Sequence, residues 1–155
     1  MKRFLKHFFA YFILMCISAF VFCYFAFGKH VIETEGYIDG TMLNEFGDFT
    51  LYCIAMFLLP FLCSASICAT LSKNTSKLNL LLIALVYVPL WLLGVTWVAE
   101  GCAVNWGNTW SATEVFFAFV VQKYVLAAPL LLGGLAISLW LQKTRVIAVD
   151  SQTLS

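Results

Sequence analysis

The sequence predicts an all-α, polytopic membrane protein: a bundle of four transmembrane helices with both termini in the cytoplasm. Four long apolar stretches alternate with short polar segments, and the basic residues gather in every second polar segment. Only 11% of the 155 residues are charged, against about 25% in soluble proteins. The polar segments are too short to build a core of their own, so a single membrane domain over residues 1–155 is expected.

The apolar stretches cover residues 8–28, 49–72, 78–99 and 115–141. The first three contain no charged side chain, and the fourth contains only Lys123. Each reaches the roughly 20 residues that a helix needs to cross the hydrocarbon core of a bilayer. Because lipid offers the backbone no hydrogen bonds, we expect each of the four segments to be helical.

The first stretch could also be read as a secretory signal peptide. It follows a basic start, but its apolar run is longer than the usual 7–15 residues or so, and its last residues are mostly aromatic. Ala26 and Gly28 form only a weak small-x-small cleavage pattern. We therefore expect the segment to be retained as a membrane helix.

Charge predicts the orientation. The segments before the first span, between the second and third and after the fourth are basic, with Lys2, Arg3, Lys6, Lys73, Lys77, Lys143 and Arg145. The two other connections, residues 29–48 and 100–114, are acidic. Since basic flanks stay cytoplasmic, both termini are expected inside and the two acidic loops outside.

Several function classes lack their sequence signature. There is no basic surface for nucleic acid, and no nucleophile–base motif or phosphate-binding glycine loop. His7 and His30 are expected at opposite faces of the membrane, which is unpromising for a metal site. We therefore expect neither an enzyme nor a bound cofactor or metal.

Six cysteines raise the possibility of thiol chemistry. Membrane thiol oxidoreductases of similar size need cysteine pairs at the outer face, whereas here only Cys102 lies in an expected outer loop. Cys102 is thus the candidate thiol. We expect it to be free and open to an impermeant maleimide, with pairing to Cys53 or to a second chain as the alternatives.

Lys123 is the one charge within an apolar stretch. Either it reaches the outer interface along its own flexible stem, or it faces the interior and pairs with an outer carboxylate such as Glu100, Asp48 or Glu45. A charge at the bilayer centre costs roughly 2.5–3.5 kcal/mol on insertion scales, so the two readings differ greatly in energy.

Prolines and small residues suggest how the helices pack. Each of the last three spans has one central proline, and ordinary kinks are expected because no span contains an Asp or Glu for ion transport. Small-residue pairs such as Gly134 with Ser138 and Ala65 with Ala69 suggest that the second and fourth helices meet. The first helix carries aromatics all round and is expected at the periphery.

The outer loops are the expected recognition surface, although tryptophans there also suit an interfacial aromatic belt. With the lone lysine, the candidate interaction residues are Tyr37, Glu45, Asp48, Glu100, Trp106, Trp110 and Lys123.

By elimination, the sequence predicts a non-enzymatic bacterial inner-membrane protein that binds another membrane or membrane-inserting protein, of the immunity, exclusion or accessory-subunit type. The bacterial origin is inferred from the basic bias and the lack of an outer glycosylation sequon. The alternative is a small transporter or channel, or a membrane thiol oxidoreductase. A homo-oligomer is left open.

Overall fold

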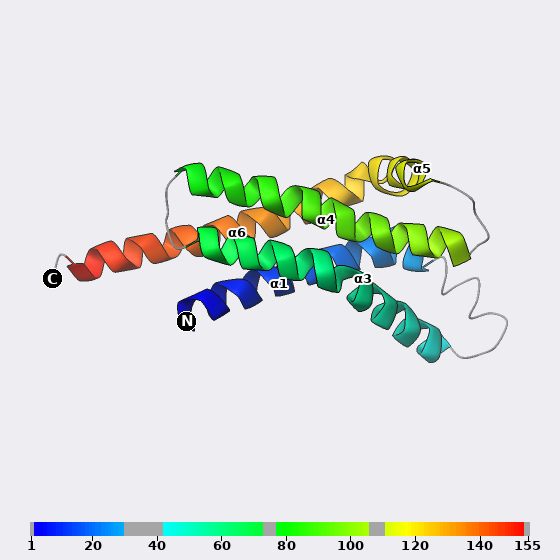
Figure 1. Ribbon diagram of the computed structural model, residues 1–155, viewed down its shortest axis with the longest axis horizontal. Helices are drawn as coiled ribbons and strands as arrows, with labels where there is room; N and C mark the ends of the chain where they lie inside the picture. Colours follow the sequence, from blue (N-terminus) through cyan, green and yellow to red (C-terminus); the bar gives the residue numbers. More distant parts are fainter. Residues whose placement is uncertain (1, 30–41, 73–76, 106–110, 154–155) are drawn as a thin grey trace.

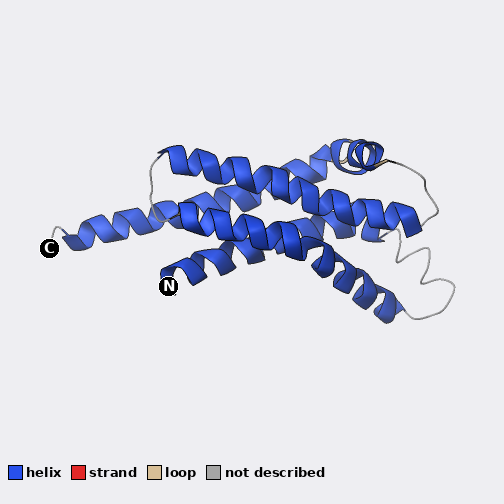
Figure 2. Cartoon of the chain, viewed as in Figure 1, coloured by secondary structure: helices blue, strands red, loops and turns tan. Residues whose placement is uncertain are grey.

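The computed structural model describes residues 2–29, 42–72, 77–105 and 111–153, and every regular element in these ranges is helical (Figures 1 and 2). Their order is α1 (Lys2–Cys23), the π-helical turn η1 (Tyr24–Gly28), α3 (Met42–Leu71), α4 (Lys77–Asn105), α5 (Ala112–Val115), the π-helical turn η2 (Phe116–Val121) and α6 (Tyr124–Thr153).

Three of these helical segments are long and apolar enough to cross a membrane: Phe4–Gly28, Phe46–Leu71 and Leu78–Cys102. A fourth crossing exists only if Ala112–Val121 and Tyr124–Trp140 are counted as one broken span, because an 84° bend separates them. The all-helical class is therefore confirmed, with three or four segments long and apolar enough to cross a membrane. The continuous fourth helix expected over residues 115–141 is wrong.

The bend has a clear local cause. In η2 the Gln122 amide reaches back five residues to the Phe117 carbonyl (3.0 Å), and the carbonyl of Lys123 then accepts from both the Leu126 and Ala127 amides to start α6. The polar Gln122–Lys123 pair thus lies where one helix ends and the next begins. Figure 1 views α5 nearly end-on, whereas α6 runs along the bundle.

α1 occupies a central place, which corrects the expected peripheral position. It packs against α3, α4 and α6, whereas α3 and α6 barely touch each other. One face of α1 is buried from Tyr11 to its end, through Tyr11, Met15, Ser18, Ala19, Phe22 and Cys23. The repeat of three to four residues is that of a helix stripe. Phe9 and Phe25 are exposed, whereas most of the other aromatics of the first span are at least partly buried.

The small residues do permit close approach, but between other helices than expected. Gly134 of α6 lies against the Tyr87 hydroxyl of α4 and near Ser18 of α1. On α3, the Cys68 thiol reaches the Ile83 carbonyl of α4 at 4.0 Å. The predicted pairing of the second and fourth helices is therefore wrong, because α1 and α4 lie between them.

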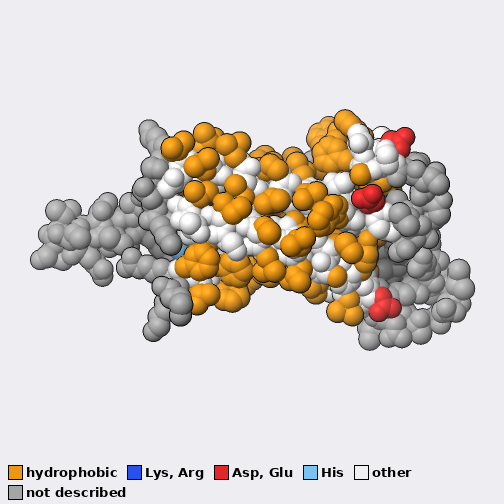
Figure 3. All heavy atoms as spheres, viewed as in Figure 1, with side chains coloured by type: hydrophobic (Ala, Val, Ile, Leu, Met, Phe, Trp, Pro, Cys, Tyr) orange, Lys and Arg blue, Asp and Glu red, His pale blue; other side chains and the backbone are white. Residues whose placement is uncertain are grey.

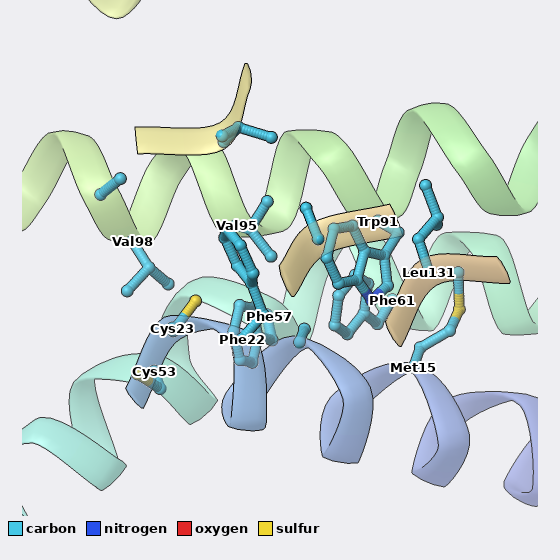
Figure 4. Packing of buried hydrophobic residues seen from close by; sticks show 14 of the residues in the cluster. Met15, Phe22, Cys23, Cys53, Phe57, Phe61, Trp91, Val95, Val98 and Leu131 are labelled. Carbon is cyan, nitrogen blue, oxygen red and sulfur yellow. The ribbon is translucent and has the colours of Figure 1, made fainter. Parts of the chain in front are cut away.

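The centre of the core is aromatic. The Trp91 indole packs on the Phe22 ring with 5.5 Å between ring centres, and Phe57 stacks on Phe61 at 5.0 Å. Gly94 of α4 allows the Phe57 and Phe61 rings of α3 to approach the α4 backbone closely. Figure 4 shows these rings filling the space between α1, α3 and α4.

The helices also extend beyond the predicted spans. Residues 42–48 belong to α3 and residues 100–105 to α4, so Asp48, Glu100 and Cys102 are helical rather than in loops. The three central prolines are accommodated inside α3, α4 and α6. In Figure 1 the first part of α3 turns away from the bundle axis, as the expected proline kink would produce.

Candidate functional site

Acidic side chains gather at one end of the molecule, where α3 and α5 begin and α4 ends (Figure 3). Asp48 and Glu114 are exposed and Glu100 is partly exposed. The start of α1 and the end of α6 lie at the opposite end of the molecule (Figure 1). We call the end that carries the acidic side chains the acidic end.

Glu114 has a structural role as well as a charge. Its carboxylate accepts from the Ser111 amide and hydroxyl, both at 2.8 Å, and the Ser111 hydroxyl accepts from the Glu114 amide at 3.4 Å. This capping box satisfies the orphan amides that begin a helix. It fixes the start of α5 at the acidic end, although the sequence stretch that follows is almost wholly apolar.

The helix that follows the cap packs one face on the bundle. Val115 and Val120 are buried, Phe117 is exposed, and both α5 and η2 contact α4. After Val120 the chain is no longer covered by other helices: residues 121–125 are all exposed, with Tyr124 65% and Val125 71% exposed. We call residues 121–125 the elbow.

The elbow contains the lysine that the sequence singled out. Lys123 is exposed at the junction of η2 and α6, as expected if the side chain reaches the interface rather than the bundle interior. Its carbonyl begins α6, and its neighbours Gln122, Tyr124 and Val125 are exposed as well. A basic, an amide and an aromatic residue are therefore exposed within a short stretch of an otherwise apolar sequence.

The other candidate interaction residues are distributed differently. Asp48 and Glu100 lie at the acidic end on α3 and α4. Glu45 is in the first turn of α3, and its side chain lies outside the described part of the structure. The candidates Tyr37, Trp106 and Trp110 also fall outside the described residues.

Cys102 does not lie in a loop, as the sequence suggested. It belongs to the last turns of α4 and is only 6% exposed, so ready labelling by an impermeant maleimide is no longer expected. The Tyr52 hydroxyl of α3 lies against Gly101, the residue before Cys102. None of the cysteines in the described part of the chain forms a disulfide.

Buried polar groups link the helices deeper in the bundle. The Trp91 indole N–H donates to Ser18 Oγ at 2.8 Å, and the Ser18 hydroxyl donates to the Met15 carbonyl at 3.1 Å. The Tyr87 hydroxyl is close to Ser18 but forms no well-aligned hydrogen bond within the described part of the chain. These groups join α1 to α4 and leave no charge inside the bundle.

Within the described ranges, no group of three or more His, Cys, Asp or Glu side chains is placed to hold a metal ion. Comparison of the chain with protein-family models, with curated proteins and with solved structures finds no match. The fold itself is all-helical in the described residues, and its apolar helices indicate a multi-pass membrane protein.

Sequence reasoning missed two features of this arrangement: the exposure of the elbow, and the packing of α1 on α3 that buries Cys23 and Cys53. The sequence did contain a signal for the elbow, namely the adjacent polar residues Gln122 and Lys123 within an apolar run. The two cysteines lie in different spans, and nothing in either segment reveals which faces of the helices meet.

Proposed function

We propose that this protein is a non-enzymatic bacterial inner-membrane protein that binds another membrane or membrane-inserting protein, as immunity, exclusion or accessory subunits do. The elbow is the proposed centre of contact, and the acidic end is the proposed rim. Both termini are proposed to lie in the cytoplasm, which places the acidic end on the outer side.

The exposed elbow carries the proposal. An uninterrupted helix over residues 115–141 would satisfy nearly all of its backbone groups within lipid, with Pro129 removing one hydrogen bond, yet the chain breaks at residues 122–123 and presents Lys123 on its surface. Ionisable residues within membrane-spanning segments are rare and usually functional. Lys123 and Tyr124 therefore mark the surface most suited to a specific partner.

The chemistry of the elbow suits protein recognition. Tyrosine is enriched among residues that dominate binding energy, because it buries a large ring and keeps a polar tip. Tyr124 and Val125 provide apolar area, and Lys123 offers a charge that a carboxylate of the partner can neutralise. Such a pair, once shielded from water, would favour the correct partner over neighbouring membrane proteins.

Site-specific photocrosslinking tests the proposal. A photoreactive residue at Val125 should capture a membrane protein, whereas the same residue at Leu132, which is 58% exposed on the same helix, should capture only lipid. Lys123→Glu should lower capture at Val125 at least threefold. Lys6→Glu is the matched control, since Lys6 is exposed at the opposite end.

Equal capture from both positions, or capture unaffected by Lys123→Glu, would show that the elbow is an ordinary lipid-facing surface. Folded yield and circular dichroism of each variant separate lost binding from lost structure.

The bend also favours a second candidate, a small transporter or channel. Broken helices supply free carbonyls for solutes in many transporters. Against it, the described spans bury only serine, tyrosine, tryptophan and cysteine as polar groups. Solute flux through proteoliposomes containing the purified protein alone would favour transport over binding.

A further inference from the structure

α6 is much shorter as a membrane crossing than the helices beside it. Its apolar part is Tyr124–Trp140, which is about 26 Å long at 1.5 Å per residue. The candidate spans of α3 and α4, Phe46–Leu71 and Leu78–Cys102, have 26 and 25 residues, or about 39 and 38 Å. A hydrocarbon core about 30 Å thick is therefore shorter than the spans of α3 and α4 but longer than that of α6.

The segment before α6 does not supply the missing length. Ala112–Val121 is bent by 84° from Tyr124–Trp140, so it runs across the bundle and adds little to the height of α6. Both α5 and η2 pack on α4. Figure 1 shows this arrangement, with α5 seen nearly end-on and α6 running along the bundle. Because the segment lies across the bundle, its two ends are at similar depths in a bilayer.

Each end of this crossing segment carries an exposed charge. Glu114 lies in its first turn and Lys123 follows its last residue, and both side chains are exposed. The residues between them, 115–121, are all apolar. An exposed charge is costly in hydrocarbon and is accommodated by headgroups and water. Since the two charges lie at similar depths, that depth is where the headgroups are expected.

The aromatic residues of α6 place the two membrane surfaces at the same levels. Tyr124 at its start is 65% exposed, and Trp140 near the end of its apolar part is 62% exposed. Tyrosine and tryptophan are enriched where a bilayer meets water, on both sides of the membrane. The two residues are about 24 Å apart along the helix. This distance again indicates a bilayer that is thinner beside α6 than the average core.

We propose that α5, η2 and the elbow form an interfacial surface that binds the phospholipid headgroups of the leaflet at the acidic end and draws them inward, so that the bilayer is thin beside α6. Local thinning is an established response of a bilayer to a short span and to a charge at depth. The Lys123 ammonium group donates to lipid phosphates, while Phe117, 56% exposed, contacts the acyl chains. This lipid contact goes beyond the proposed partner binding and does not depend on it.

Depth-dependent quenching in the full-length protein tests the proposal. A genetically encoded fluorescent amino acid replaces Val125 or, as the matched control, Leu93 of α4, which is also exposed. Leu93 is as many residues from Leu78 as Val125 is from Trp140, about 23 Å in each case, so a bilayer of uniform thickness gives them equal depths. The protein is placed in dioleoyl phosphatidylcholine vesicles with a nitroxide either on the headgroup or near the acyl-chain end. The ratio of headgroup to chain-end quenching should be at least about threefold higher at Val125.

Two further measurements separate the cause from its consequence. Lys123→Leu should lower the ratio at Val125 toward that at Leu93, because the anchor for the headgroups is lost, whereas Lys6→Leu at the opposite end should not. In dilauroyl phosphatidylcholine the two ratios should converge, since a thin bilayer already matches α6. The lipid comparison needs no change at Lys123 and so decides the matter even if Lys123→Leu folds poorly.

Equal ratios at Val125 and Leu93 in the dioleoyl lipid would overturn the proposal, because the bilayer would then be uniform around the bundle. A gap that survives in the dilauroyl lipid, or a ratio at Val125 that Lys123→Leu leaves unchanged in a folded protein, would overturn it as well.

Discussion

The hydrogen bond from Trp91 to Ser18 offers a sharp test of how this bundle is held together. Trp91 is completely buried on α4, and its indole N–H donates to Ser18 Oγ of α1 at 2.8 Å. Ser18→Ala removes the acceptor and leaves a buried donor with no partner. We therefore expect Ser18→Ala to weaken the contact between α1 and α4.

The expected magnitude follows from two limits. An orphaned buried donor costs about 1–3 kcal/mol in general, while polar contacts between membrane helices average about 0.6 kcal/mol and reach about 1.7. We expect Ser18→Ala to cost about 1–2 kcal/mol, which raises the unfolding constant roughly 5- to 30-fold. A double-mutant cycle with Trp91→Phe should give a coupling energy of about 0.6–1.7 kcal/mol.

Reversible unfolding in mixed micelles, followed by far-UV circular dichroism, measures both quantities. Ser66→Ala is the matched control, because the Ser66 hydroxyl donates only to the Leu62 carbonyl of its own helix, at 2.7 Å. Such local bonds add little to stability, so this change should be nearly neutral. If Ser18→Ala costs no more than Ser66→Ala, or the coupling energy is zero, the reasoning fails.

Three further predictions follow from burial and charge. Gly134→Ala should lower the free energy of unfolding by about 1–3 kcal/mol, because the new methyl group meets the Tyr87 hydroxyl, and Tyr87→Phe should restore part of this loss. Gly133→Ala is the control: its methyl group meets open space, so the change should be neutral or stabilising. Equal effects of the two glycine substitutions in unfolding assays would contradict the packing. An impermeant maleimide should label Cys102 at least tenfold more slowly in the folded than in the denatured protein, and comparable rates would show that α4 frays at its end. Reporters fused after Lys77 and at the C-terminus should both signal the cytoplasm, and an outside signal at either place would refute the proposed topology.

Much of the local structure could be predicted from the sequence. Uncharged apolar runs require helices wherever lipid surrounds them, and the stretches that became α1, α3 and α4 are helical throughout their described residues. The predicted ends of the helices were less accurate, since residues 100–105 were expected in a loop but belong to α4. Hydropathy marks where a chain leaves lipid, and a helix does not have to stop there.

The candidate site was predicted only in part. Lys123 could be identified from the sequence because a charge in lipid is costly. The structure shows Lys123 exposed at a helix break, which the continuous apolar pattern did not predict. Phe116 to Val121 reads as membrane helix by composition. Its direction was decided by contacts with α4 and by the cap at Ser111 and Glu114.

The sequence by itself determined that this is a helical chain with several segments able to cross a membrane, because the backbone has no other way to satisfy its hydrogen bonds in lipid. Only the tertiary structure decided that α1 is central and packs on α3, and that the fourth segment bends by 84°. A membrane helix is apolar on every face, whether a face meets lipid or a neighbouring helix. Shape complementarity and a few buried polar groups therefore choose the contacts, and neither can be read from one segment alone.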